Sequence, residues 1–140
     1  MTWFAPGAPG DPRRSERGLA TVEAVLVVPL VLVPVLVGVV VFGSLEHTHL
    51  VLDAAAAAGA RAAAVAGADT PAVRARIDTE LADGGLSASN AQVTIDPSVA
   101  AWGEPISVRV AIAGQASIPF LGSWPVPMSS TFVTRSEVTH

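Results

Sequence analysis

Residues 23–42 read EAVLVVPLVLVPVLVGVVVF, and after Glu23 this stretch contains no charged side chain. Between Ala24 and Phe42 it holds ten Val, four Leu and one Phe. As a helix with a rise of ~1.5 Å per residue it would be about 28 Å long, close to the ~30 Å hydrocarbon thickness of a bilayer. The sequence therefore predicts a transmembrane helix, which we place at residues 19–43.

Insertion of this run into a bilayer is favourable. At roughly −0.3 to −0.6 kcal/mol for each Val, Leu or Phe, the total is about −4.5 to −9 kcal/mol. Glu23 lies at the edge, where an acid costs less than the ~3 kcal/mol it costs at the bilayer centre. A cleaved secretory signal is the alternative, because A-x-A patterns follow within residues 54–60. The run is longer than the ~7–15 residues of a signal's apolar region, which favours a retained anchor.

Pro29 and Pro34 interrupt the apolar run. Proline has no amide hydrogen, and its ring crowds the carbonyl four residues earlier, here those of Val25 and Leu30. In lipid these carbonyls need other partners. We expect the helix to be bent or loosened at both prolines, as a tolerated kink rather than a working hinge.

Residues 1–18 precede the span and form a predicted disordered basic leader. Residues 1–12 are rich in Pro and Gly and have little to bury, so we expect disorder there. Arg13, Arg14 and Arg17 follow. Because basic residues beside a span stay on the cytoplasmic side, we predict a single-pass protein of the cell membrane. Its N-terminus would be cytoplasmic, and residues 44–140 would form an extracytoplasmic domain.

Composition restricts the classes of function. The 140 residues allow one small domain in addition to the membrane segment. The net charge is −4, and the region after Phe42 has five Arg against nine acids. Nucleic-acid binding needs a basic patch, so we expect no nucleic-acid partner. The chain has no cysteine, which excludes disulfides and thiol chemistry.

A helix is predicted over residues 44–66, as a continuation of the span. This region has no proline after Leu45 and is rich in Ala, the best helix former. Gly67 is its expected end. One apolar stripe at helical spacing is formed by Leu45, Leu52, Ala56, Gly59 and Ala63.

A second helix is predicted over residues 71–83. Thr70 is a suitable N-cap, and Pro71 suits the first helical position. The pair Gly84-Gly85 is the expected end. The apolar stripe of this helix is Val73, Ile77 and Leu81, and its solvated face is Arg74, Arg76, Asp78, Glu80 and Asp83.

After Ser87 the apolar residues recur with a period of two, which indicates strands. We predict strands at residues 91–95, 106–112 and 131–138, and we expect residues 118–128, broken by prolines, to be a loop or an edge strand. Together they would form a small antiparallel sheet with one face packed on the outer half of the long helix. The predicted fold class is α+β, with a long N-terminal helix whose inner half spans the membrane.

No residues suggest catalysis. His47 and His49 are two positions apart, so on a helix they point to different sides and do not form a metal pair. The sequence contains no obvious Ser/His/Asp set, Gly-rich phosphate loop or cysteine motif. We therefore expect neither an enzyme nor a bound cofactor or metal.

Glu23 has two interpretations. An ionisable residue at a membrane boundary is a functional hypothesis by default. A carboxylate also suits the positive end of a helix dipole, so Glu23 could simply mark the helix start. The spacing alone leaves both interpretations open.

Three segments resemble the TadE-like proteins, which are minor pilins or pseudopilins of the tight-adherence type IV pilus. They are Arg17–Pro29 (RGLATVEAVLVVP), Gly38–Gly43 (GVVVFG) and Ala58–Ala64 (AGARAAA). The chain departs from the family where Val41 replaces a common acid and Ala57 a common arginine. The resemblance covers roughly Arg13 to Gly67, half of the chain, and the C-terminal sheet is similar to the family in layout and not in a motif; it implies a pilin-like fold.

The resemblance also implies how the chain is processed and with what it assembles. A prepilin peptidase would cleave between Gly18 and Leu19, making Glu23 the fifth residue of the mature chain. Glu23 would then neutralise an N-terminal amine during assembly with other pilin-like subunits and the pilus machinery. The alternative is a signal-anchored extracytoplasmic binding protein unrelated to pili.

Overall fold

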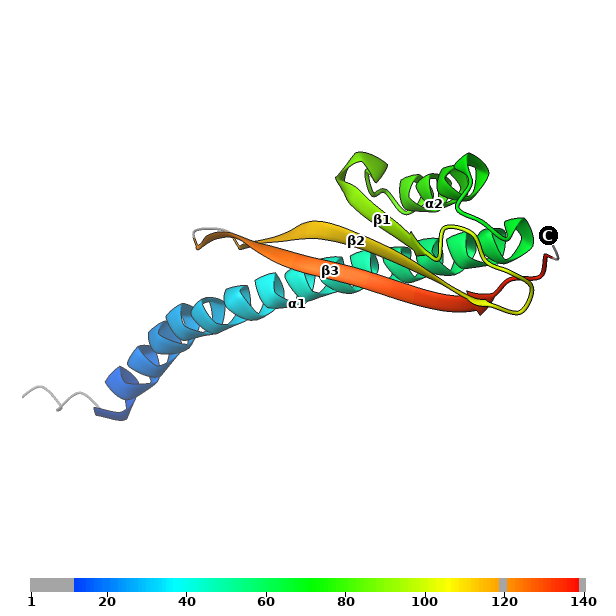
Figure 1. Cartoon of the computed structure of the whole chain (residues 1–140). Helices are drawn as coiled ribbons and strands as arrows, with labels where there is room; N and C mark the ends of the chain where they lie inside the picture. Colours follow the sequence, from blue (N-terminus) through cyan, green and yellow to red (C-terminus); the bar gives the residue numbers. More distant parts are fainter. Residues whose placement is uncertain (1–11, 119–120, 139–140) are drawn as a thin grey trace, which may run out of the picture. The chain divides into compact units, whose positions relative to one another are not determined.

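The computed structural model describes residues 12–118 and 121–138 (Figure 1). It divides into two compact units, one reaching Val39 and one beginning at Val40. The first helix, α1, is assigned from Pro12 to Ala66 and contributes to both units. Among the described residues it is the one helix that is long and apolar enough to cross a membrane, by length and composition.

The start of α1 differs from the predicted leader. Residues 1–11 lie outside the described residues, but residues 12–18 are helical rather than disordered. A proline is favourable at the first position of a helix, because the amide it lacks would have no partner there. Arg, Glu, Leu and Ala follow, and all are good helix formers. The Pro/Gly-rich composition ends at Pro12, and the prediction extended it too far.

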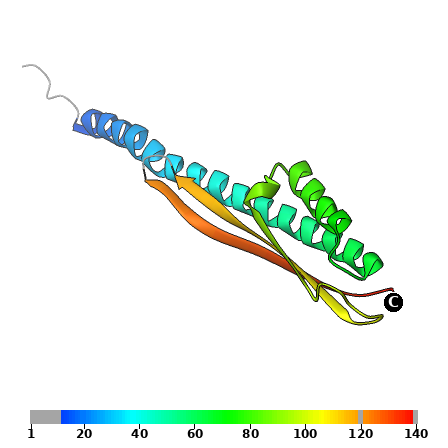
Figure 2. The ribbon, with the colours of Figure 1, turned by 45° about the horizontal axis from the view of Figure 1, so that its top comes forward.

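The second unit is an α+β domain, as the sequence predicted. Its helical parts are residues 40–66 of α1, the helix α2 (Pro71–Asp83) and the short 3₁₀ helix η1 (Ala88–Asn90). Its sheet contains β1 (Ala91–Asp96), β2 (Pro105–Ile118) and β3 (Gly122–Arg135). The strands are antiparallel in the order β1-β2-β3. Strands β2 and β3 form a long hairpin that runs alongside the outer part of α1 (Figure 2).

Two strands differ from their predicted bounds. β2 continues to Ile118, and β3 already begins at Gly122 and includes Pro125 and Pro127. Prolines are tolerated on an edge strand, where the missing amide would face outward, and β3 is at the edge of the sheet. β3 ends at Arg135 and not at Val138, because Ser136 and Glu137 leave the sheet to bond elsewhere.

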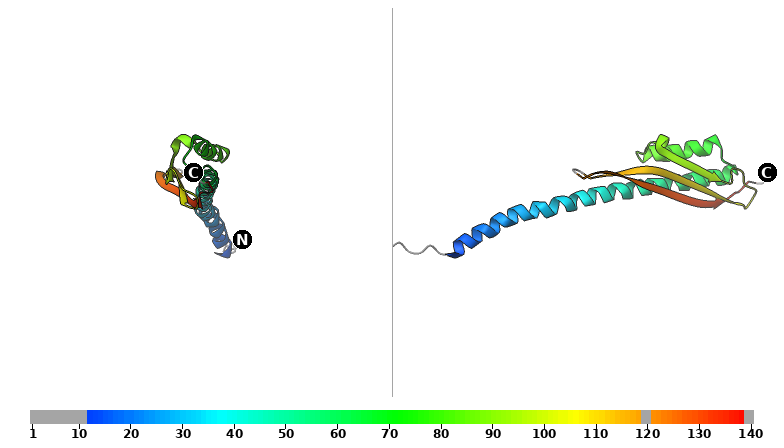
Figure 3. Two further views of the ribbon diagram at one scale, coloured as in Figure 1. Left: turned by 45° about the vertical axis from the view of Figure 1, so that its right-hand side comes forward. Right: turned by 60° about the vertical axis from the view of Figure 1, so that its left-hand side comes forward.

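The core of the second unit lies where α1, α2 and the sheet meet. Seen nearly end-on, α2 and the sheet lie on neighbouring sides of the outer part of α1 (Figure 3, left). Gly59 is at this junction, since a Cβ there would lie 2.5 Å from Ile77 Cγ1 and 3.3 Å from Val108 Cγ1. The core side chains are Val51, Leu52, Ala55, Ala56, Ala60, Ala63, Val73, Ile77, Leu81, Ile95, Ala100, Ile106, Val108 and Val110. The predicted stripes of both helices and of β2 therefore face this core, with Leu45 only partly buried.

Hydrogen bonds join the C-terminal end of α1 to residue Ala100 and to the residues that follow β3. Gly67 ends α1 with a φ of 65°, and its carbonyl accepts from Ala100 N at 2.9 Å. Glu137 N donates to Ala64 O at 2.9 Å. The hydroxyl of Ser136, a buried residue, donates to Ala100 O at 3.3 Å. These bonds fix the last residues of the sheet region to the end of the helix.

Candidate functional site

The predicted processing site lies within α1. Gly18, Leu19 and Glu23 all have helical backbone. Leu19 and Glu23 are four residues apart, so their Cα atoms lie on the same side of the helix, one turn apart. Glu23 is exposed. The backbone of Arg13, Arg14 and Arg17 is in the first turns of the same helix, before Gly18.

Most large side chains of the apolar run are exposed, and only Val37 and Val41 among them are partly buried. Such a helix is suited to a lipid environment, because helices of soluble domains keep one polar face. These large side chains are 48–74% exposed: Val25, Leu26, Val27, Val28, Leu30, Val31, Leu32, Val33, Val35, Leu36, Val39, Val40 and Phe42. One N-terminal apolar helix of this kind fits a single-pass membrane protein.

The helix assignment continues through Pro29 and Pro34. Neither proline can donate to the carbonyl four residues earlier, so the carbonyls of Val25 and Leu30 lack the usual helical bond. Both prolines lie within the apolar run, where water is not available as a replacement partner. The predicted bend or loosening at these positions stays a prediction.

The outer end of the apolar run is marked by polar side chains that bond back to the helix. Ser44 Oγ donates to Val41 O at 2.8 Å, and Thr48 Oγ1 donates to Ser44 O at 2.9 Å. Such bonds allow hydroxyls near a bilayer to satisfy their donors within their own helix. Glu46 is the first charged residue after Glu23, and it is exposed. The surface of the bilayer would therefore lie close to residues 43–46.

The two helical histidines have separate partners. His47 Nε2 lies 3.2 Å from Gly84 O at the end of α2, and His49 Nδ1 lies 3.2 Å from Asp53 Oδ2 on α1 itself. Among the residues described, no group of three or more His, Cys, Asp or Glu side chains could hold a metal ion.

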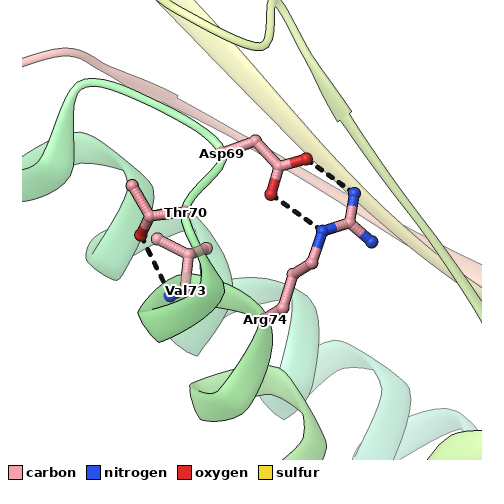
Figure 4. A network of polar contacts seen from close by, with 4 residues as sticks. All are labelled: Asp69, Thr70, Val73 and Arg74. Atoms are coloured by element: carbon pink, nitrogen blue, oxygen red, sulfur yellow. Dashed lines mark hydrogen bonds and ion pairs between the residues drawn. The ribbon is translucent and has the colours of Figure 1, made fainter.

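The start of α2 carries a polar network that is structural (Figure 4). Thr70 Oγ1 accepts from Val73 N at 3.3 Å, which confirms the predicted N-cap. Arg74 donates to both carboxylate oxygens of Asp69, at 2.9 and 2.6 Å. This hydrogen bonding and the negative charge of Asp69 raise the pKa of Arg74. Arginine is already protonated at every physiological pH, so the shift has no functional role. On the same solvated face, Arg76 pairs with Glu80.

One contact escaped the sequence analysis. Gly84 was predicted only as a helix stop, but a Cβ there would collide with the side chain of Val51. Gly84 therefore allows the end of α2 to approach α1 closely, beside the hydrogen bond that its carbonyl accepts from His47. No local signal identifies this role, because Val51 lies far away in the sequence.

These observations define the class of protein: a single apolar N-terminal helix, capable of spanning a membrane, that leads into an α+β domain. The family model described as TadE-like protein matches residues 18–61. The match begins at Gly18, contains the apolar run and ends in the outer part of α1, which confirms the resemblance found in the sequence. It indicates a membrane protein associated with the Tad pilus. No curated protein and no solved structure matches the chain.

Proposed function

We propose that this chain is a membrane-anchored, pilin-like protein that takes part in assembling a tight-adherence type IV pilus. The observation that carries the proposal is the TadE-like match over residues 18–61. That segment contains the proposed cleavage point, the carboxylate of Glu23 and the complete apolar run. α2 and the sheet lie outside it, so the proposal rests on the anchor helix and not on the outer domain.

Cleavage after Gly18 would create a charged amine with which Glu23 can pair. Cleavage gives Leu19 a free, positively charged amine directly before the apolar run. Burying that charge among lipid or neighbouring helices is costly unless it is paired. Glu23 is the one acid between Leu19 and Glu46, so it is the partner this part of the chain offers to the amine of a neighbouring pilin-like subunit.

Gly18 would also give the peptidase access to the backbone. A glycine inside a helix costs about 1 kcal/mol relative to alanine, because it loses more backbone freedom on ordering. The helix would therefore open more easily at the bond to be cut than at its neighbours. The three arginines before Gly18 would hold this bond at the cytoplasmic face, and residues 44–140 would lie outside the cytoplasm.

Cleavage is tested by mass spectrometry of the mature chain. Co-expression with the cognate prepilin peptidase should remove residues 1–18 and leave Leu19 as the N-terminus. Gly18→Leu should block this processing, whereas the matched change Gly38→Leu, within the apolar run, should leave it intact. An N-terminus that stays uncut in the presence of active peptidase would contradict the proposal and favour a signal-anchored binding protein.

Orientation is tested separately with two reporter fusions after His140. Alkaline phosphatase, which is active only outside the cytoplasm, should be active there. A fluorescent protein that matures only in the cytoplasm should stay dark. The reverse pattern would contradict the proposed topology, whatever the fate of Gly18.

A further inference from the structure

The β2–β3 hairpin lacks charge over most of its length. Residues 110–134 contain no Asp, Glu, Lys or Arg, although Arg109 and Arg135 stand directly on either side. The hairpin is nevertheless amphipathic, because side chains alternate between the two faces of a strand. Gln115, Ser117 and Ser123 lie on one face, and Trp124, Val126 and Met128 lie on the other.

The apolar face extends beyond the core that it helps to form. Ile112 and Met128 are register partners and pack against the core. Past them the same face continues through three further pairs, Gly114–Val126, Ala116–Trp124 and Ile118–Gly122. Trp124 is 47% exposed and Leu121, at the turn, is 70% exposed. We call residues 116–118 and 121–126 the hairpin tip; Ala116, Ile118 and Val126 are partly buried on its apolar face, and Trp124 and Leu121 remain the exposed apolar side chains.

β2 is long enough for the hairpin tip to reach the outer end of the apolar run of α1. Val108 lies beside Gly59, and β2 runs from there back along the outer part of α1 (Figures 1 and 2). Ten residues of strand, from Val108 to Ile118, span about 33 Å. The seventeen residues of helix from Gly59 back to Phe42 span about 26 Å. The strand is therefore long enough to reach the level of Phe42 even when it crosses the helix at an angle.

We propose that the hairpin tip rests in the headgroup region of the leaflet from which α1 emerges, with Trp124 and Leu121 in contact with lipid. Tryptophan is enriched at membrane interfaces, where its amphipathic ring sits at the level of the headgroups. An apolar face in this position is typically buried about 5–10 Å into the boundary between headgroups and acyl chains. The inference rests on α1 being a membrane span and is independent of pilus assembly.

A lipid surface fits this region better than a second copy of the chain. Pro125 and Pro127 remove two amide donors from β3, one of the two strand edges on which another chain could pair beside the tip. The absence of charge from residues 110–134 also leaves the tip without ionic groups that could select a protein partner. The same absence lowers the cost of placing the hairpin against a bilayer.

Depth-dependent quenching in vesicles tests the proposal with the full chain. The protein is reconstituted in phosphatidylcholine vesicles with acyl chains brominated near the headgroup, near the chain end, or not at all. One variant keeps Trp124 as its sole tryptophan (Trp3→Phe and Trp102→Phe). The matched variant keeps Trp102 (Trp3→Phe and Trp124→Phe), which is 69% exposed and precedes the opposite end of β2. Only protein that floats with the vesicles and resists protease as the wild type does is measured.

The proposal expects loss of most Trp124 emission with bromine near the headgroup, a smaller loss with bromine near the chain end, and no loss for Trp102. Unquenched Trp124 with blue-shifted emission would place it against protein, including a second copy. Unquenched Trp124 with red-shifted emission would place it in water. Equal quenching of both tryptophans would mean that the domain lies flat on the bilayer without using its tip. Each of these three results overturns the proposal.

Discussion

The two ends of α1 are built from different residues and stabilised by different surroundings. Residues 24–42 are mainly Val and Leu, and most of their large side chains are exposed. Residues 51–64 are mainly Ala, and Leu52, Ala56, Ala60 and Ala63 are fully buried against α2 and the sheet. The more hydrophobic end is thus the more exposed one, which is the inverse of the arrangement in a soluble domain.

This inversion shows which property each end needs. The inner end has to be uniformly apolar, because lipid contacts every side of it. The outer end has to be narrow, because α2 and the sheet both approach it closely at Gly59. Small side chains allow that approach, whereas bulky ones supply the transfer energy for insertion. Equivalent substitutions should therefore have opposite consequences at the two ends.

The largest expected effect is at Glu23, with Glu46 as its matched control at the other border of the apolar run. If Glu23 pairs with a subunit's amine in lipid, Glu23→Gln leaves that amine buried alone. Breaking a buried pair typically costs about 3–5 kcal/mol, enough to weaken association several-hundredfold. The variant should insert and be cleaved normally, yet fail to co-purify with pilin partners and give few pili.

Glu46→Gln should leave assembly unchanged, because Glu46 is exposed and the apolar run separates it from the new amine. Protein level and cleavage are checked in parallel for both variants. Wild-type association of Glu23→Gln would reduce Glu23 to a residue that starts a helix.

The next largest effect is on the stability of the outer domain, and it is tested by comparing two leucines of α1. Leu52 is fully buried in the core, and Leu36 is 54% exposed within the apolar run. Leu52→Ala leaves a cavity and should cost the outer domain about 2–5 kcal/mol, a large part of the stability of a small domain. Leu36→Ala should leave that stability unchanged. Urea unfolding of the full chain in detergent, followed by Trp102 fluorescence, measures both variants. Equal midpoints for the two would show that the outer core does not depend on Leu52.

A smaller contrast is expected at two glycines of the same helix. A Cβ at Gly59 would crowd Ile77, whereas nothing lies within 4 Å of one at Gly38. Gly59→Ala should destabilise the outer domain by about 1–3 kcal/mol through overpacking. Gly38→Ala should be neutral or slightly favourable, since alanine is the better helix former. The same unfolding assay separates them, and a stabilised Gly59→Ala would show that α1 and α2 do not approach each other closely.

The sequence predicted those features of the structure that depend on neighbouring residues in the chain, and it missed those that depend on tertiary contacts. The bounds of α2 were predicted because Thr70, Pro71 and Gly84 act within one turn of its ends. The sequence left residues 118–128 open between a loop and an edge strand, because the tolerance of prolines in β3 depends on its position at the sheet edge. Ser136 leaves the strand for carbonyls brought near by folding. Such tertiary partners leave no local pattern.

The candidate site also has features that the sequence predicts and features that only the structure shows. The position of Glu23 at the start of the apolar run and the spacing from Gly18 can be read directly from the sequence. The geometry adds that the backbone at the proposed cleavage point is helical. The hairpin tip was missed, because Trp124 and Val126 belong to the proline-broken residues 118–128, which were predicted to be either a loop or an edge strand. Only the register with β2 shows that they share a face with Val110 and Ile112.

The smallest expected effect concerns α2. This helix is much shorter than α1, and lipid does not surround it as it surrounds the inner end of α1. At 13 residues α2 is near the limit at which an isolated helix is only marginally stable, so its first turn depends on Thr70. Thr70→Ala removes the acceptor of Val73 N and should cost about 1 kcal/mol, a fall in Tm of about 4–8 °C for a domain of this size.

Thr79 provides the matched control within the same helix. Its hydroxyl donates to Ala75 O at 2.8 Å, a shorter bond than that of Thr70, but this carbonyl can already accept a bond from the helix backbone. Thr79→Ala should therefore leave Tm unchanged or raise it slightly, because alanine has the higher helix propensity. Thermal unfolding of both variants in detergent decides the matter: a drop for Thr79→Ala equal to that for Thr70→Ala would mean that any lost hydroxyl bond weakens α2, and that its first turn has no special dependence on the cap.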